Sequence, residues 1–128
     1  MIGLPPGVTA ATGMDALTHA VEAYISRIAI PETDQMALEA VSLIMRNLPR
    51  VMENGEDEDA RQMMSWAAYR AGLAFSRAGL GYVHGIAHNL GAHYHTPHGL
   101  ANAICFKRAV GGQQSCYSVS GASVGSTV

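Results

Sequence analysis

The strongest constraint on the fold is a helical spacing of apolar residues through most of the chain, with almost no pattern typical of strands. Apolar side chains recur every three or four residues. The breaks between these stretches hold glycines, prolines and acidic clusters, which commonly mark helix ends. We therefore expect an all-α protein, a bundle of about five helices in one domain.

The spacing also predicts where these helices lie. The expected ranges are Thr12–Ser26, Glu32–Met52, a third helix from the acidic residues 56–59 to Ser76 or Arg77, Tyr82–His93 and Pro97–Phe106. Either Thr9 or Thr12 would cap the first helix. Pro31 suits the first turn of the second helix, and Pro49 should kink or end its regular part.

Each of the first two helices is expected to bury one apolar stripe. The stripes are Met14, Leu17, Val21 and Tyr24 in the first, and Leu38, Val41, Met45, Leu48 and Met52 in the second. The acidic run at 56–59 is typical of a solvated helix start, because it lacks the glycine and glutamate spacing of a calcium loop. Gly79 and Gly81 should end the third helix.

Composition excludes several classes of protein. The chain of 128 residues has a net charge of −2 and no basic run, which argues against nucleic-acid binding. No apolar run reaches the roughly 18 residues of a membrane span. Cys105 and Cys116 make neither a disulfide framework nor a thiolate metal site, and no secretory signal is present, so we expect a cytoplasmic protein. Because only 14% of residues are charged, we expect some apolar faces to be covered, which would support a homo-oligomer.

The histidines carry most of the chemical information. Five of the six lie between His84 and His98, and the sixth, His19, follows Asp15 by four residues. On a helix this spacing puts Asp15 and His19 on one face, one turn apart. They could form a carboxylate–imidazole hydrogen bond on an exposed face, or they could be two metal ligands.

His84 and His88 are also four residues apart on an expected helix. The zinc-peptidase motif needs glutamate directly after the first histidine, and Gly85 stands there, so that activity is excluded. His98 lies in the opening turn of the last helix, where a chain reversal can bring it back. Three imidazoles and one carboxylate would suit Zn²⁺ or Fe²⁺. The alternative is a histidine-rich surface tract.

Two long segments, PPGVTAATGMDALTHAVEAYIS and AGLAFSRAGLGYVHGIAHNLGAHYHTPHGLANAI, closely resemble the iron-containing (group III) alcohol dehydrogenases. The resemblance runs from about Leu4 to Ile104 and implies the helical metal-binding domain of the dehydroquinate-synthase-like fold. It implies that the metal ligands are Asp15, His19, His84 and His98. It also implies that His88 lies beside substrate and nicotinamide, with a catalytic role, and that Phe75 lies near the nicotinamide ring. His93 and His95 match no functional position.

The implied function is NAD(P)-dependent, metal-assisted interconversion of a primary alcohol and an aldehyde, with Fe²⁺, or Zn²⁺ in its place, holding the substrate oxygen. A reductase for another carbonyl, such as maleylacetate or a 2-oxo acid, is the alternative within the family. The family's glycine-rich nucleotide-binding domain is missing from this sequence. We therefore expect a fragment that is not a working dehydrogenase alone. Two further hypotheses are a non-catalytic divalent-metal-binding helical module and a non-functional remnant.

The composition changes after Val110, where the sequence becomes rich in serine and glycine and carries no charge. We expect residues 1–110 to form the incomplete metal-binding domain. Residues 111–128 are expected to be a disordered tail or a scar.

Overall fold

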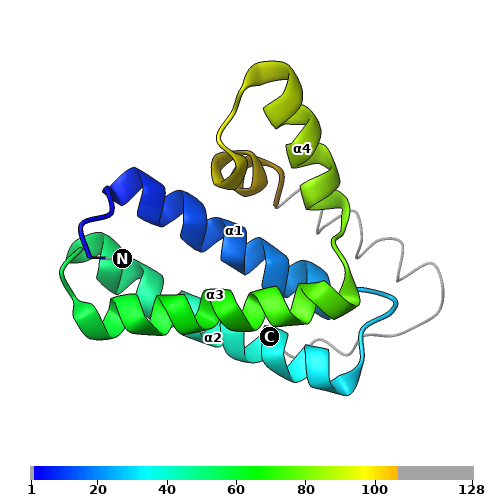
Figure 1. The fold of residues 1–128 in the computed structure, drawn as a ribbon, viewed down its shortest axis with the longest axis horizontal. Helices are drawn as coiled ribbons and strands as arrows, with labels where there is room; N and C mark the ends of the chain where they lie inside the picture. Colours follow the sequence, from blue (N-terminus) through cyan, green and yellow to red (C-terminus); the bar gives the residue numbers. More distant parts are fainter. Residues whose placement is uncertain (1, 107–128) are drawn as a thin grey trace.

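The structure of the protein is a computed structural model that describes residues 2–106, and Figure 1 shows that all of its regular structure is helical. The helices are α1 (Pro6–Tyr24), α2 (Pro31–Glu53), α3 (Glu58–Ala78) and α4 (Tyr82–Tyr94), followed by a helical segment at residues 98–106. No strand occurs within the described range. The prediction of an all-α bundle is confirmed.

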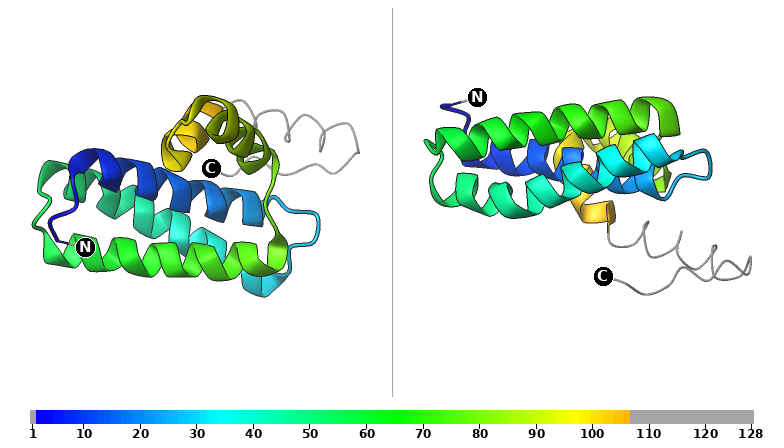
Figure 2. Two further views of the ribbon diagram at one scale, coloured as in Figure 1. Left: turned by 45° about the horizontal axis from the view of Figure 1, so that its top comes forward. Right: turned by 90° about the horizontal axis from the view of Figure 1, so that it is seen from below.

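The helices α1, α2 and α3 pack together along their lengths as a three-helix bundle (Figures 1 and 2). Small residues line the contact, and Ala20, Ala40 and Ala71 are fully buried at its middle. Larger side chains, including the fully buried Ile44, fill the part of the core nearer the start of α1. Because alanine has a small side chain, the three helix backbones can approach one another closely at these positions.

The helix α1 begins earlier than the threonines predicted, and its start is set by proline. Pro6 lies in the first turn, and the carbonyl of Pro5 accepts the Thr9 amide at 3.0 Å. The expected threonine cap is wrong: the Thr12 hydroxyl donates within the helix to the Val8 carbonyl at 2.8 Å. Proline has a φ angle already suited to a helix and lacks the N–H that a cap would serve.

The helix α2 continues through Pro49 to Glu53, close to the expected Glu32–Met52. Of the two effects predicted for Pro49, a kink or an end, the end does not occur. Proline leaves the carbonyl four residues earlier, that of Met45, without its usual donor. Both residues are on the exposed face, where water can serve that carbonyl. The end of the helix is closed by the Asn54 amide, which donates to the Arg50 carbonyl at 2.8 Å.

The apolar stripe predicted for α2 is confirmed at Val41 and Leu48, which pack against the core, and wrong at its other three residues. Leu38, Met45 and Met52 are 52%, 64% and 42% exposed, whereas Ala37 and Ile44 are fully buried. The buried face is therefore rotated by about one residue from the stripe of large side chains. Close packing against α1 and α3 favours small residues such as Ala37 and Ala40 in the contact, and Leu38, Met45 and Met52 remain outside it.

The ends of α3 agree with the sequence. The Asp57 carboxylate accepts the Ala60 amide at 3.0 Å as an N-cap, and Glu58 and Asp59 occupy the first turn. Gly79 ends the helix with a φ angle of 77°, a conformation that favours glycine. The solvated helix start predicted at the acidic run is confirmed.

The helix α4 and residues 98–106 form a second layer that lies on α1 (Figures 1 and 2). They share an apolar cluster in which Val83 and Cys105 are buried. His95, with a φ angle of 54°, ends α4 in the left-handed conformation, and the chain then reverses into the last helix. Gly99 packs directly against the α1 backbone at Ala11.

Two expectations concern other parts of the chain. The tail predicted at 111–128, including Cys116, lies outside the described residues. Among residues 2–106, no helix combines the length and the apolar character needed to cross a membrane.

Candidate metal centre

The helix α1 supplies the first two candidate ligands from one face. Asp15 and His19 lie one turn apart, with the Nδ1 atom of His19 3.7 Å from the Oδ2 atom of Asp15. Their side chains are 26% and 18% exposed, so the predicted pair faces the second layer rather than open solvent.

His84 comes from the first turn of α4 and is buried above this pair. Its Nε2 atom lies 3.4 Å from Oδ1 of Asp15, and its ring stacks on that of His19 at a centroid distance of 4.3 Å. The three residues can each offer a ligand atom such that all three atoms lie within 4.8 Å of one another. They are thus close enough to share one cation.

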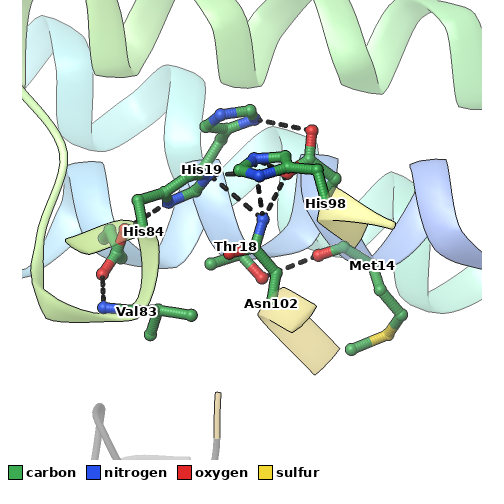
Figure 3. A network of polar contacts seen from close by, with 9 residues as sticks. Met14, Thr18, His19, Val83, His84, His98 and Asn102 are labelled. Atoms are coloured by element: carbon green, nitrogen blue, oxygen red, sulfur yellow. Dashed lines mark hydrogen bonds and ion pairs between the residues drawn. The ribbon is translucent and has the colours of Figure 1, made fainter. Parts of the chain in front are cut away.

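His98, from the last helix, approaches the same oxygen of the Asp15 carboxylate as His84 does. Its Nε2 atom lies 3.1 Å from Oδ1 of Asp15, and its ring centroid is 5.2 Å from that of His84. Its side chain is 43% exposed, so it forms the open edge of the group. The structure therefore groups Asp15, His19 and His84 closely and places His98 at the edge of this group, beside Asp15 and His84. Figure 3 shows the three histidines, which come from three separate helices.

The donor set fits a borderline divalent cation on chemical grounds. Three imidazole nitrogens with one carboxylate oxygen match Fe²⁺ and Zn²⁺, whereas Mg²⁺ and Ca²⁺ prefer oxygen ligands alone. The buried Oδ1 atom of Asn102 has no hydrogen-bond partner among the described residues, which leaves one further polar atom beside the group.

Asn102 is a member of the cluster that sequence reasoning missed. Its Nδ2 atom lies 2.5 Å from Oδ1 of Asp15, 3.1 Å from Nε2 of His98 and 3.3 Å from Nε2 of His84 (Figure 3). A signal was present, because Asn102 follows His98 by four residues and so shares its helix face.

Glu22 is the second residue that was missed. Its Oε2 atom lies 2.6 Å from Nδ1 of His84, and its Oε1 atom accepts the Val83 amide at 2.7 Å. Both the Glu22 and His84 side chains are almost completely buried. Its spacing of seven residues from Asp15 and three from His19 places it on the same face of α1, which the sequence could have indicated.

The two carboxylates are held in their charged forms. Burial favours the neutral acid, but hydrogen bonding to His84 and the nearby His19 and His98 rings outweigh it and lower the pKa of Asp15. The pKa of Glu22 is lowered in the same way, against burial, by hydrogen bonds from His84 and from backbone amides. The site thus concentrates negative charge that a cation would neutralise.

The two buried imidazoles respond in opposite directions. Burial lowers the pKa of His19. Burial acts on His84 in the same direction, but hydrogen bonds to Asp15 and Glu22 outweigh it and raise the pKa of His84 to about 9. The carboxylates of Asp15 and Glu22 therefore favour the charged form of His84.

His88 and Phe75 lie next to the cluster. The exposed His88 ring is 5.2 Å from that of His98 and 6.1 Å from that of His84, measured between centroids. Phe75 stacks on the other face of His19, with a centroid distance of 4.3 Å. Their expected roles toward substrate and nicotinamide remain predictions. His93 and His95 are exposed.

Comparison with known proteins gives a consistent result. The family description "Fe-containing alcohol dehydrogenase family, C-terminal" matches residues 9–119. The chain is 55% identical over 104 residues to alcohol dehydrogenase 4 of Schizosaccharomyces pombe, covering 81% of this chain and 25% of that protein. It is 57% identical over 104 residues to 1,3-propanediol dehydrogenase of Klebsiella pneumoniae, covering 81% and 27%.

Solved structures agree with these relatives. A crystal structure of 1,3-propanediol oxidoreductase superposes with a TM-score of 0.82 at 56% identity, covering 83% of this chain and 28% of that one. An alcohol dehydrogenase from Oenococcus oeni gives a TM-score of 0.80 at 46% identity, covering 81% and 27%. The chain thus spans about a quarter of the length of the curated relatives it matches.

Proposed function

The chain belongs to the Fe-containing alcohol dehydrogenase family, and we propose that it forms the first part of the metal-binding domain of an NAD(P)-linked alcohol dehydrogenase. The proposal rests on one observation: His19, His84 and His98 approach the Asp15 carboxylate from three helices. We assign this domain to residues 1–110. The substrate would be a small alcohol or its aldehyde.

These four residues would hold Fe²⁺, with Zn²⁺ as the second candidate. When bound, the cation supplies a Lewis acid that polarises an alcohol or aldehyde oxygen. Asp15 contributes the negative charge at the centre of the group, and the buried His84 fixes the inner side. The exposed edge at His98 leaves room for substrate to approach.

His88 is proposed to move a proton or orient the substrate. It is exposed beside His98 and lies one turn along α4 from His84, so it can face the same space without being a ligand. Phe75 is proposed to contact the nicotinamide ring of NAD(P). Phe75 stacks on His19, so a nicotinamide ring in contact with Phe75 would lie close to the proposed metal ligands.

The direct test is cation binding by the complete 128-residue chain. A calorimetric titration with Co²⁺ or Zn²⁺ should show one binding site per chain. The substitution His84→Ala should strongly weaken cation binding at this site. His93→Ala is the matched control, because His93 is on the same helix but exposed. Equal affinity of His84→Ala and the unaltered chain would overturn the proposal.

A non-catalytic metal-binding module is the second candidate. It is favoured because all four proposed ligands lie within residues 2–106, although the chain spans only about a quarter of the length of its relatives. A titration with NADH separates the two candidates. Measurable NADH binding supports the dehydrogenase and would overturn the module, which binds a cation alone. Circular dichroism distinguishes both from a remnant, which should unfold without cooperativity.

A further inference from the structure

We propose that Glu22 is a positioning residue that fixes the tautomer of His84, so that Nδ1 carries the proton and Nε2 is free to bind the cation. The inference rests on the proposed function, because it takes His84 as a ligand. Glu22 does not reach the ligand cluster directly: it contacts the far side of the His84 ring, at Nδ1.

The two oxygens of Glu22 have separate tasks. Oε1 accepts the Val83 amide in the first turn of α4, at 2.7 Å, and Oε2 lies 2.6 Å from Nδ1 of His84. The N-cap residue of α4, Gly81, has no side chain for capping, so Glu22 supplies from α1 the negative charge that a helix start favours. Glu22 thus holds the start of α4 and the His84 imidazole at the same time.

The contact distances around the His84 ring favour this tautomer. A carboxylate only accepts hydrogen bonds, so the amide group of Asn102 turns its Nδ2 donor toward Asp15. The same Nδ2 atom lies 3.3 Å from Nε2 of His84. On the same side, Nε2 also lies 3.4 Å from Oδ1 of Asp15, whereas Nδ1 lies only 2.6 Å from Oε2 of Glu22. Because the contact with Glu22 is by far the shorter, the proton of the neutral ring is held at Nδ1, facing Glu22.

The substitution Glu22→Gln tests the idea with almost no change in shape. The Val83 amide can only donate, so the single glutamine oxygen must turn toward it. The glutamine NH₂ group then faces Nδ1 of His84, which has to accept and must leave the ring proton on Nε2. That tautomer cannot bind a cation through Nε2. We expect a loss of about 10- to 100-fold in Co²⁺ or Zn²⁺ affinity, the usual effect of removing such a partner.

A double-mutant cycle separates positioning from a purely structural role. If Glu22 acts through His84, Glu22→Gln should change affinity less than about twofold when His84→Ala is already present. A role in folding alone would weaken binding in both backgrounds. Circular dichroism checks that each variant is folded.

A second measurement needs no variant. In the ¹⁵N-labelled, Zn²⁺-loaded chain, nuclear magnetic resonance should show a protected His84 Nδ1 proton and coordination at Nε2. Coordination at Nδ1 would overturn the inference, as would unchanged affinity in Glu22→Gln. Either result leaves the proposed function intact provided that His84→Ala weakens binding. A chain that binds no cation overturns both.

Discussion

Gly99 offers a way to move one ligand without touching any ligand side chain. A Cβ atom added at Gly99 would lie 2.1 Å from the carbonyl oxygen of Ala11 and 2.5 Å from its carbon. Real Cβ contacts stay beyond 3.0 Å, so the two backbones must separate by about 0.9 Å. Neither backbone can give way by a side-chain rotation. The helix at 98–106 must therefore move off α1.

This displacement would carry His98 away from Asp15, because His98 directly precedes the substituted residue. Cation sites tolerate errors of only about 0.2 Å in ligand distance. We expect Gly99→Ala to weaken Zn²⁺ affinity about 10- to 100-fold, or about 1.4–2.8 kcal/mol. Calorimetric titration of the complete chain measures the effect.

The matched control is Gly85→Ala, directly after His84. A Cβ atom at Gly85 meets no atom within 4 Å, and alanine favours helix by about 1 kcal/mol over glycine. This variant should keep its affinity and be at least as stable. If Gly99→Ala bound Zn²⁺ as tightly as Gly85→Ala, the close approach of the two backbones would not position His98, and the reasoning would be refuted.

Three further predictions address the core, a helix cap and the neighbouring histidine. Ile44→Ala should lower the free energy of unfolding in urea by about 2–5 kcal/mol, because Ile44 is fully buried, whereas Met45→Ala should change little at 64% exposure. The hydrogen bond that the Ala60 amide donates lowers the pKa of Asp57 below its ordinary 3.8. The cap therefore stabilises the fold above pH 3.8, and this stabilisation is lost as the pH falls through the lowered pKa. The urea unfolding curves of Asp57→Asn and the unaltered chain should converge in acid. His88→Ala should leave Zn²⁺ affinity unchanged, and a lost site would make His88 a ligand.

The sequence predicted the helices well because their ends are local chemistry. The Asp57 cap and the Gly79 stop each depend on a few neighbouring residues, and both occur as expected. The pairing of Asp15 with His19 is local in the same sense, since a helix alone places them one turn apart. Helix spacing could not show that His98 would meet them. A chain reversal made the meeting possible, and the family resemblance implied it.

The features that the sequence missed depend on packing between helices. Large apolar residues such as Met45 looked like the buried face of α2, but the neighbouring helices approach too closely for them and bury Ala37 and Ala40 instead. Glu22 looked like an ordinary charged residue on a helix. Only the arrival of α4 shows that its carboxylate meets a backbone amide and His84.

The arrangement of the core explains why the polar cluster matters to the fold as well as to chemistry. Among the described residues, the apolar clusters of α1, α2 and α3 are separate from the cluster that joins Val83 of α4 to Cys105. The second layer therefore meets α1 through the close backbone approach of Gly99 to Ala11 and through Asp15, Glu22 and their partners. Negative charges that attract a cation also hold α4 and the last helix in place, so cation binding and docking of the second layer should stabilise each other.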